Sequence, residues 1–230
     1  MVADFSDAPV RAFLPLLTQR RVSRELLVAL AAPVVAERVV HLLDDATRGR
    51  LVGPRRDLRA SAHALLRLVL TELTGTAPRD HRLVVRCRTC GEAAHGKPVL
   101  EHPALHVSLS ASRTAVAVAV SGAAPVGVDV EQVDLAAFAG FAEVVLAPGE
   151  RADDAAARAR AWTRKEAVLK ATGHGLAVDP REVDVSRDQV HRPERAELLD
   201  VPSPAGTACS AAVLGTRRPR LRVEERSLRD

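Results

Sequence analysis

Residues 162–176 have the sequence WTRKEAVLKATGHGL, and this stretch organises the interpretation of the whole chain. Its apolar spacing predicts one amphipathic helix that ends at a pair of glycines. Trp162 and Leu169 are seven residues apart and share a face of that helix, with Glu166 between them. A carboxylate on an apolar stripe is costly unless it is paired or binds a cation. Glu166 is therefore either the partner of Lys170 in a pair within the helix or part of a cation site.

A second stretch, PVGVDVEQV at residues 125–133, alternates strictly between apolar and polar side chains. Such alternation predicts a strand with three valines on one face and Gly127, Asp129 and Glu131 on the other. The two carboxylates would stand about 7 Å apart and repel one another unless a cation lay between them. Together with Glu166 they offer three oxygen ligands, a set that suits Mg²⁺. The alternative is an edge strand with a solvated acidic face.

The segments VGVDVE and WTRKEAVLK resemble, in order and spacing, the two signature motifs of the Sfp-type 4'-phosphopantetheinyl transferases. The upstream tripeptide Gly96-Lys97-Pro98 also fits that family, and the resemblance runs from about Arg55 to the last strand. It implies an α+β fold of two similar halves, residues 1–125 and 126–230, related by a pseudo-twofold axis with the active site between them. It also implies that the 4'-phosphopantetheine arm of coenzyme A is transferred to a serine of an acyl or peptidyl carrier protein, with release of 3',5'-ADP.

The resemblance also implies roles for individual residues. Asp129, Glu131 and Glu166 would hold Mg²⁺, and Glu166, or else Glu131, would take the proton of the carrier serine. Lys170 would offset charge on the phosphates, with Lys165 as a weaker candidate for the same task. Further contacts to coenzyme A would come from Arg55, Gly96, Lys97, Pro98 and Ser110.

One position departs from the family pattern. Many members have Ser-His-Ser where this chain has Ser110, Ala111 and Ser112. In the family the serine and histidine hold the 3'-phosphate of coenzyme A. Because of Ala111, a non-catalytic module that binds coenzyme A or a nucleotide stays an alternative to an enzyme.

Composition narrows the classes of protein to which the chain can belong. The 230 residues are 47% apolar and 27% charged, which is typical of a compact soluble protein. A pI of about 9.5 would suit a nucleic-acid-binding domain, but only 2% of the residues are aromatic and little is available to stack on bases. Of the 33 basic residues only Lys97, Lys165 and Lys170 are lysines, and all three fall in the motifs above.

The cysteines and the N-terminal residues predict a location. MVADFSDAP lacks the apolar core of a signal peptide, and no apolar stretch is long enough to span a membrane. Three cysteines do not make a full disulfide framework and favour a reducing cytoplasm. Cys87 and Cys90 form a C-x-x-C near His81 and His95, which we interpret as a loop with free thiols rather than a zinc site. We expect a cytoplasmic monomer that binds neither nucleic acid nor a membrane.

Residues 135–146, which follow the acidic strand, carry Phe138 and Phe141 three positions apart. In the resembling family this segment helps to receive the carrier protein, which is typically acidic. The rings would then anchor the carrier. The alternative is that both rings belong to the core.

The spacing of apolar residues, together with the positions of glycine and proline, predicts further helices and strands. Residues 24–43 have a mostly helical period, residues 44–50 form a short capped turn, residues 55–73 form an amphipathic helix, and Pro148 opens the helix that reaches Lys170. Strands are expected at residues 82–87, 106–112, 114–120, 182–185, 196–201, 207–214 and 221–225.

Overall fold

The computed structural model describes residues 25–86, 90–91, 96–101, 105–136, 138–215 and 217–229. The described strands form two four-stranded sheets, ordered β10-β1-β5-β4 and β6-β9-β8-β7, and a hairpin of β2 and β3. In chain order the elements are β1 (Glu25–Ala31), α2 (Ala36–Val39), α3 (Asp45–Gly49), α4 (Arg56–Thr74), β2 (Leu83–Arg86), β3 (Lys97–Leu100), β4 (His106–Ala111), β5 (Val116–Ser121), β6 (Val126–Gln132), α5 (Phe141–Val145), α6 (Ala155–Thr172), β7 (Gln189–Val190), β8 (Ala196–Asp200), β9 (Thr207–Leu214) and β10 (Arg220–Arg226).

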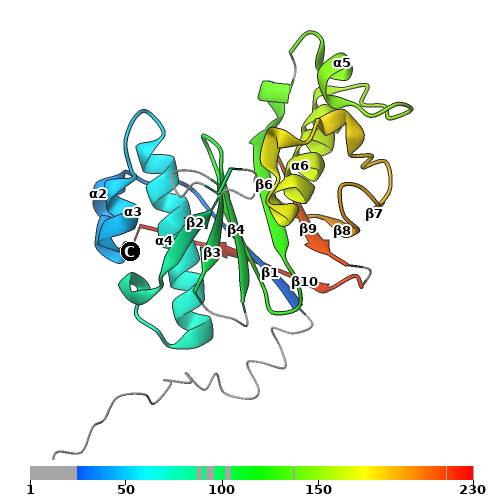
Figure 1. The fold of residues 1–230 in the computed structure, drawn as a ribbon. Coiled ribbons are helices and arrows are strands. Elements are labelled where there is room, and N and C mark those ends of the chain that lie inside the picture. Colours follow the sequence, from blue (N-terminus) through cyan, green and yellow to red (C-terminus); the bar gives the residue numbers. More distant parts are fainter. Residues whose placement is uncertain are drawn as a thin grey trace, which may run out of the picture.

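Four layers make up the molecule, and the predicted α+β class is confirmed. In Figure 1, α4 lies on the left and α6 on the right, with β4 and β6 between them. Each long helix covers the outer face of one sheet and ends at a glycine in the left-handed region, Gly75 or Gly173. The two halves therefore repeat the same pairing of helix and sheet.

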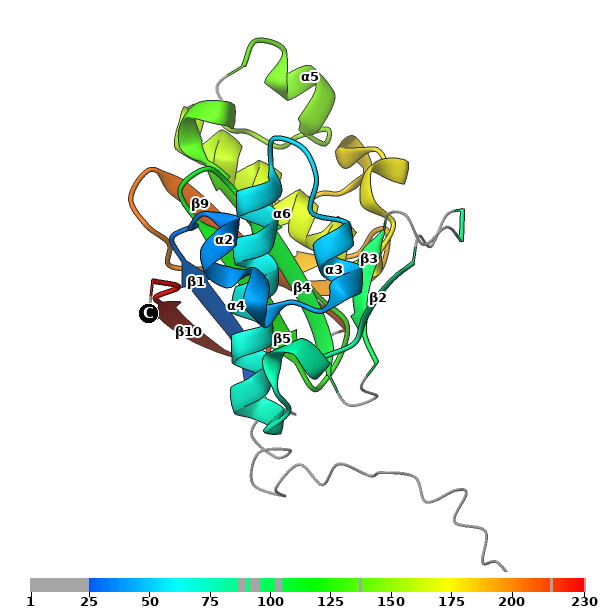
Figure 2. The ribbon, with the colours of Figure 1, turned by 90° about the vertical axis from the view of Figure 1, so that its left-hand side faces the viewer.

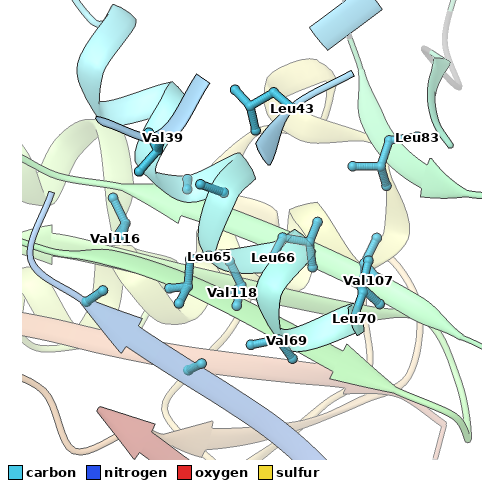
Figure 3. Packing of buried hydrophobic residues seen from close by; sticks show 14 of the residues in the cluster. Val39, Leu43, Leu65, Leu66, Val69, Leu70, Leu83, Val107, Val116 and Val118 are labelled. Atoms are coloured by element: carbon cyan, nitrogen blue, oxygen red, sulfur yellow. The ribbon is translucent and has the colours of Figure 1, made fainter. Parts of the chain in front are cut away.

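The helix predicted at residues 55–73 is α4, and it closes the core of the first half. Its apolar side packs on β4, β5 and β1, as the close-up in Figure 3 shows. Figure 2 views this helix from outside, with the first sheet behind it. The buried side chains labelled in Figure 3 are Val39, Leu43, Leu65, Leu66, Val69, Leu70, Leu83, Val107, Val116 and Val118.

The alternation predicted for residues 125–133 is confirmed in β6. Val126, Val128 and Val130 enter the apolar layer between the two sheets, where they meet residues of β1, β5 and β9. Gly127 and Asp129 turn to the opposite face, under α6. The strand thus separates core residues from site residues by its pleat alone.

The helix predicted from residues 162–176 is α6, but it does not begin near Pro148. Asp154 caps its N-terminus by accepting the Ala157 amide at 2.7 Å, so the first helical residue is Ala155. Pro148 instead lies in a turn in which the Glu150 amide donates to Ala147 O at 3.0 Å.

Two other predictions were wrong. Residues 25–31 form β1, not a helix. This strand lies between β10 and β5 and is buried on both faces, so its sequence ELLVALA shows no alternation. Residues 182–185 are not a strand either. Val183 and Val185 lie in an irregular segment and pack in the core under α6.

The last strand crosses the expected division between the halves. The chain does pass from the first sheet to the second near Pro125, but β10 returns and pairs in parallel with β1. Arg226 of β10 also pairs with Glu72 of α4, and Leu228 is buried in the core beneath that helix. The final strand of residues 126–230 thus completes the first sheet.

Within the described residues, no helix combines the length and the apolar character needed to cross a bilayer.

The contact between β6 and α6 yields a stability prediction. A Cβ at position 127 would lie 1.9 Å from the carbonyl oxygen of Ala167 and 2.5 Å from the amide nitrogen of Ala171. Both are backbone atoms of a packed helix, so Gly127→Ala should lower the free energy of unfolding by about 3 kcal/mol. Gly49→Ala is the control, since nothing lies within 4 Å of its added Cβ. Urea unfolding of both variants measures the difference, and equal midpoints would contradict the close approach.

Candidate active site

Three cavities lie next to one another, and two of them are lined by residues of both halves. The central cavity, of about 640 Å³, is lined by the start of α4, the end of β4, the acidic part of β6 and the middle of α6. The Gly-Lys-Pro cavity, of about 720 Å³, is lined by Gly96, Lys97, Pro98 and the segment after α6. The Phe138 cavity, of about 380 Å³, lies on the far side of Trp162.

Shared lining residues place these cavities side by side, and we call the three together the groove. Leu109, Glu166, Lys170 and Leu176 line both the central and the Gly-Lys-Pro cavities. Glu131 and Trp162 line both the central and the Phe138 cavities.

At the centre of the groove, Asp129 of β6 meets Lys170 of α6 and Ser110 of β4. The Lys170 ammonium donates to Asp129 Oδ1 at 2.6 Å and to Ser110 Oγ at 3.0 Å. The Ser110 hydroxyl donates to the same Asp129 oxygen at 2.6 Å. Asp129 is buried, so the ammonium neutralises a carboxylate that water cannot reach well. Lys170 of α6 thus pairs with Asp129 of β6, and not with Glu166 of its own helix as one of the two sequence-based alternatives had it.

The other two carboxylates lie near enough to Asp129 to feel its charge. Burial raises the pKa of Glu166, the charge of Asp129 raises it further, and Lys170 lowers it. Burial also raises the pKa of Glu131, against the lowering effect of the Gln132 amide that it accepts at 2.8 Å. The structure thus brings the three predicted acids to one cavity as a set of mutually repelling groups.

The three acids do not form a ready metal site as they stand. In the part of the chain that the structure describes, no three His, Cys, Asp or Glu side chains are grouped closely enough to hold one ion. Their chemistry nevertheless fits a hard divalent cation, because all the donors are carboxylate oxygens and two of them are destabilised by a neighbouring negative charge. In this structure the Lys170 ammonium supplies the positive charge at Asp129.

Lys165, the weaker candidate for a contact with the phosphates, lines none of the three cavities. Its side chain is fully buried and pairs with Glu150 Oε2 at 2.6 Å. Its ammonium also donates to the carbonyl oxygens of Pro180 at 3.1 Å and Val183 at 2.5 Å. Lys165 therefore holds α6 to the segment that follows it, and its side chain points about 100° around the helix from that of its neighbour Glu166.

Lys97 lines the Gly-Lys-Pro cavity, but its ammonium bonds backbone carbonyl oxygens. The ammonium donates to Ala171 O at 2.8 Å, near the C-terminal end of α6, and to Val126 O at 2.9 Å. A cation at a helix C-terminus is favourable, so Lys97 fastens β3 to both β6 and α6. Gly96 and Pro98 line the same cavity beside it.

Arg55 contacts Ala111, the position at which the chain departs from the family pattern. It is the N-cap of α4, and its Nη2 donates to the carbonyl oxygen of Ala111 at 2.7 Å. Its charge also lowers the pKa of Glu131, which places it at the acidic centre. Sequence reasoning assigned no role to Arg59 or Leu176, which line the same cavity. The four-residue spacing from Arg55 was the available signal for Arg59.

The two phenylalanines have different environments. Phe141 is only 2% exposed and belongs to a core cluster, which agrees with the alternative that this ring is part of the core. Phe138 is 46% exposed, and its ring packs edge-on against Phe141 at 5.3 Å. Among the described residues of segment 135–146, the α-helix is α5, and Phe141 is its first residue.

The C-x-x-C motif lies partly outside the described residues, which include neither Cys87 nor His95. Cys90 is exposed, and His81 is buried with its Nε2 3.3 Å from Thr71 Oγ1.

Comparison with known families agrees with the motifs. Residues 125–214, about two fifths of the chain, match the sequence model of the 4'-phosphopantetheinyl transferase superfamily. This region begins just before β6, includes α6 and ends with β9. The match concerns the superfamily in general and points to phosphopantetheinyl transfer. No curated protein gives a significant match.

The raised pKa of Glu166 yields a prediction about stability and pH. A carboxyl group with a raised pKa in the folded state costs stability as pH rises above its ordinary value of 4.5. Glu166→Gln should therefore raise Tm near pH 7, and the difference from the parent should vanish near pH 4, where both side chains are neutral. Thermal unfolding at several pH values measures this, and a lower Tm of the variant near pH 7 would contradict the assigned repulsion.

Proposed function

We propose that this chain transfers the 4'-phosphopantetheine arm of coenzyme A to a serine of an acyl or peptidyl carrier protein. One observation carries the proposal: the acids Asp129, Glu131 and Glu166 and the ammonium of Lys170 meet where the cavities of one groove join. A diphosphate needs positive charge on its oxygens, and a transferred group needs room on either side. The superfamily match over residues 125–214 supports the same activity.

Coenzyme A would lie along the groove. Its base would occupy the Gly-Lys-Pro cavity, and its diphosphate would lie at the junction beside Lys170. Arg55 and Arg59, at the start of α4, would receive the 3'-phosphate, and Arg55 already contacts the backbone at Ala111. A guanidinium would then supply the charge that a histidine supplies in many relatives. The pantetheine arm would run past Trp162 toward the Phe138 cavity.

Asp129, Glu131 and Glu166 would hold Mg²⁺, which when bound would neutralise charge on the diphosphate oxygens. With Asp129 so engaged, the Lys170 ammonium would be released from that carboxylate and could bond a phosphate oxygen instead. The carrier serine oxygen forms a bond to the β-phosphorus as the bond from that phosphorus to the bridging oxygen breaks. The products are the phosphopantetheinylated serine and 3',5'-ADP.

Glu166 is our first choice for the group that takes the serine proton, and Glu131 is the second. Burial raises the pKa of both, which brings them nearer to the operating pH than an ordinary carboxylate and makes them better proton acceptors. The carrier would approach the face that carries Phe138. The monomeric state and the cytoplasmic location stay predictions.

Transfer can be tested with apo acyl and peptidyl carrier proteins, coenzyme A and Mg²⁺, followed by mass measurement of the carriers. The parent chain should add one phosphopantetheine, and Asp129→Asn should slow transfer by at least about 100-fold while the protein stays folded. Asp45→Asn, at an exposed position of α3, is the control and should transfer normally. Binding of coenzyme A without transfer to any carrier would instead favour the non-catalytic module.

The carrier face can be tested with the neighbouring rings. Phe138→Ser removes an exposed ring, so it should raise KM for the carrier and leave KM for coenzyme A and Tm nearly unchanged. Phe141→Ala removes a buried ring and should cost about 3–5 kcal/mol of stability. Steady-state kinetics and thermal unfolding of both variants separate the two roles. Unchanged carrier KM in Phe138→Ser would remove the ring from the interface.

A further inference from the structure

A fourth cavity, of about 600 Å³, is formed by α3, β2 and the residues that flank β2 and β3. Figure 2 shows α3 beside this hairpin. The cavity shares no lining residue with the three cavities of the groove, and the proposed function does not use it. Three arginines and three apolar residues of β2 line it: Arg50, Arg79, Arg82, Leu83, Val84 and Val85.

Arg50 has a buried donor without an acceptor. It follows α3 directly, and its amide donates to Thr47 O at 3.1 Å, which fixes its backbone. Its Nη2 is buried and has no hydrogen-bond partner among the described residues. Buried donors are almost always satisfied, so this guanidinium calls for an acceptor that the described part of the chain does not supply.

The other two guanidiniums of the cavity are only loosely paired. Arg79 Nη2 lies 3.8 Å from Asp45 Oδ1, and Arg82 Nε lies 3.7 Å from Glu101 Oε2. The remaining ion pairs between described residues are 3.0 Å or shorter. Asp45 is also bonded by Arg48. Loose exposed pairs contribute little, so both arginines can turn toward a ligand at small cost.

Positive charge exceeds negative charge around Arg50. Asp44 lines the cavity, but it accepts the Thr47 amide at 2.6 Å and pairs with the buried Arg67, so its charge is compensated. Burial lowers the pKa of His63 to about 4, and the charges of Arg67 and Arg50 lower it further. An anion beside Arg50 would offset this excess.

Other lining residues limit which anion can bind. Asp80 and Glu101 belong to the same lining, so a diphosphate or another polyanion would meet repulsion. Val84 is 42% exposed and offers apolar surface beside the charges. A ligand with one planar oxyanion and an apolar body matches both the guanidinium fork and the strand.

We propose that this cavity binds a small monocarboxylate with an aliphatic chain. Its carboxylate would accept a hydrogen bond from Arg50 Nη2, with Arg79 and Arg82 turned toward it, and its chain would pack on Val84. The site is independent of the proposed transfer reaction, because none of its lining residues belongs to the groove.

The test is calorimetric titration of the full chain at pH 7 with hexanoate, inorganic phosphate and 1-hexanol. Hexanoate should bind more tightly than the other two, since phosphate lacks the chain and 1-hexanol lacks the charge. Arg50→Gln should weaken hexanoate binding by about tenfold or more, through loss of a charge-assisted hydrogen bond. Val84→Ser should weaken it by about threefold, through loss of apolar contact.

Arg38→Gln is the matched control, because it removes the same charge from an exposed position of α2 that lines none of the four cavities. Lys170→Gln is the control for the groove, and both controls should bind hexanoate as the parent does. If Arg50→Gln lowers Tm, the exposed Arg79→Gln replaces it and should also weaken binding.

Four results would each overturn the proposal. They are no hexanoate binding by the parent, parent-like affinity in both arginine variants of the cavity, phosphate binding as tight as that of hexanoate, and loss of hexanoate binding in Lys170→Gln. The last result would place the acid in the groove. None of the four bears on whether the chain transfers phosphopantetheine.

Discussion

The close approach of α6 to β6 at Gly127 is the contact on which the site depends. Because this glycine has no Cβ, the backbone of α6 at Ala167 and Ala171 can rest directly on the strand. Asp129 is two residues further along the same face of β6, and Glu166 and Lys170 flank Ala167 and Ala171 on the helix. A side chain at position 127 would push the helix outward and separate Lys170 from Asp129, which are now 2.6 Å apart. Gly-x-Asp and Glu-x-x-x-Lys are thus two halves of one packing arrangement.

The rest of the helix motif keeps α6 in that place. Thr163 bonds Ser210 of β9 at 2.9 Å, and the buried Arg164 forms two hydrogen bonds to Asp200 of β8 at 2.7 and 2.8 Å. Lys165 pairs with Glu150 on the far side. The consecutive residues Thr163, Arg164 and Lys165 are therefore structural, and Glu166 faces the groove. A motif of charged residues does not have one function throughout, because neighbouring helical positions point in directions about 100° apart.

Sequence reasoning found β6 because valines alternate with Gly127, Asp129 and Glu131 along it, although Gly127 and Asp129 are buried as well. It found α6 from its glycine stop and the positions of Trp162 and Leu169, although the helix is buried on most sides. It failed at β1, whose two faces are both buried, so that the apolar run carries no period. It could not place β10 either, because parallel pairing with β1 joins the two ends of the described chain and leaves no local signal. The burial of Lys165 was not visible in the sequence for a related reason. A lysine can be buried when a carboxylate and two carbonyl oxygens surround it, and those partners are distant in sequence.

The acidic centre shows how a site can carry excess negative charge and still fold. Asp129 is neutralised internally by Lys170 and Ser110, while Glu131 and Glu166 bear the remaining repulsion, which appears as raised pKa values. Lys170 is partly exposed and sits on a rigid helix, so its ammonium can leave Asp129 by side-chain rotation alone. A cation bound to the carboxylates would remove the repulsion and also release the ammonium toward an anionic ligand. The same electrostatic cost that lowers stability in the empty site would thus favour the arrival of a cation together with a diphosphate.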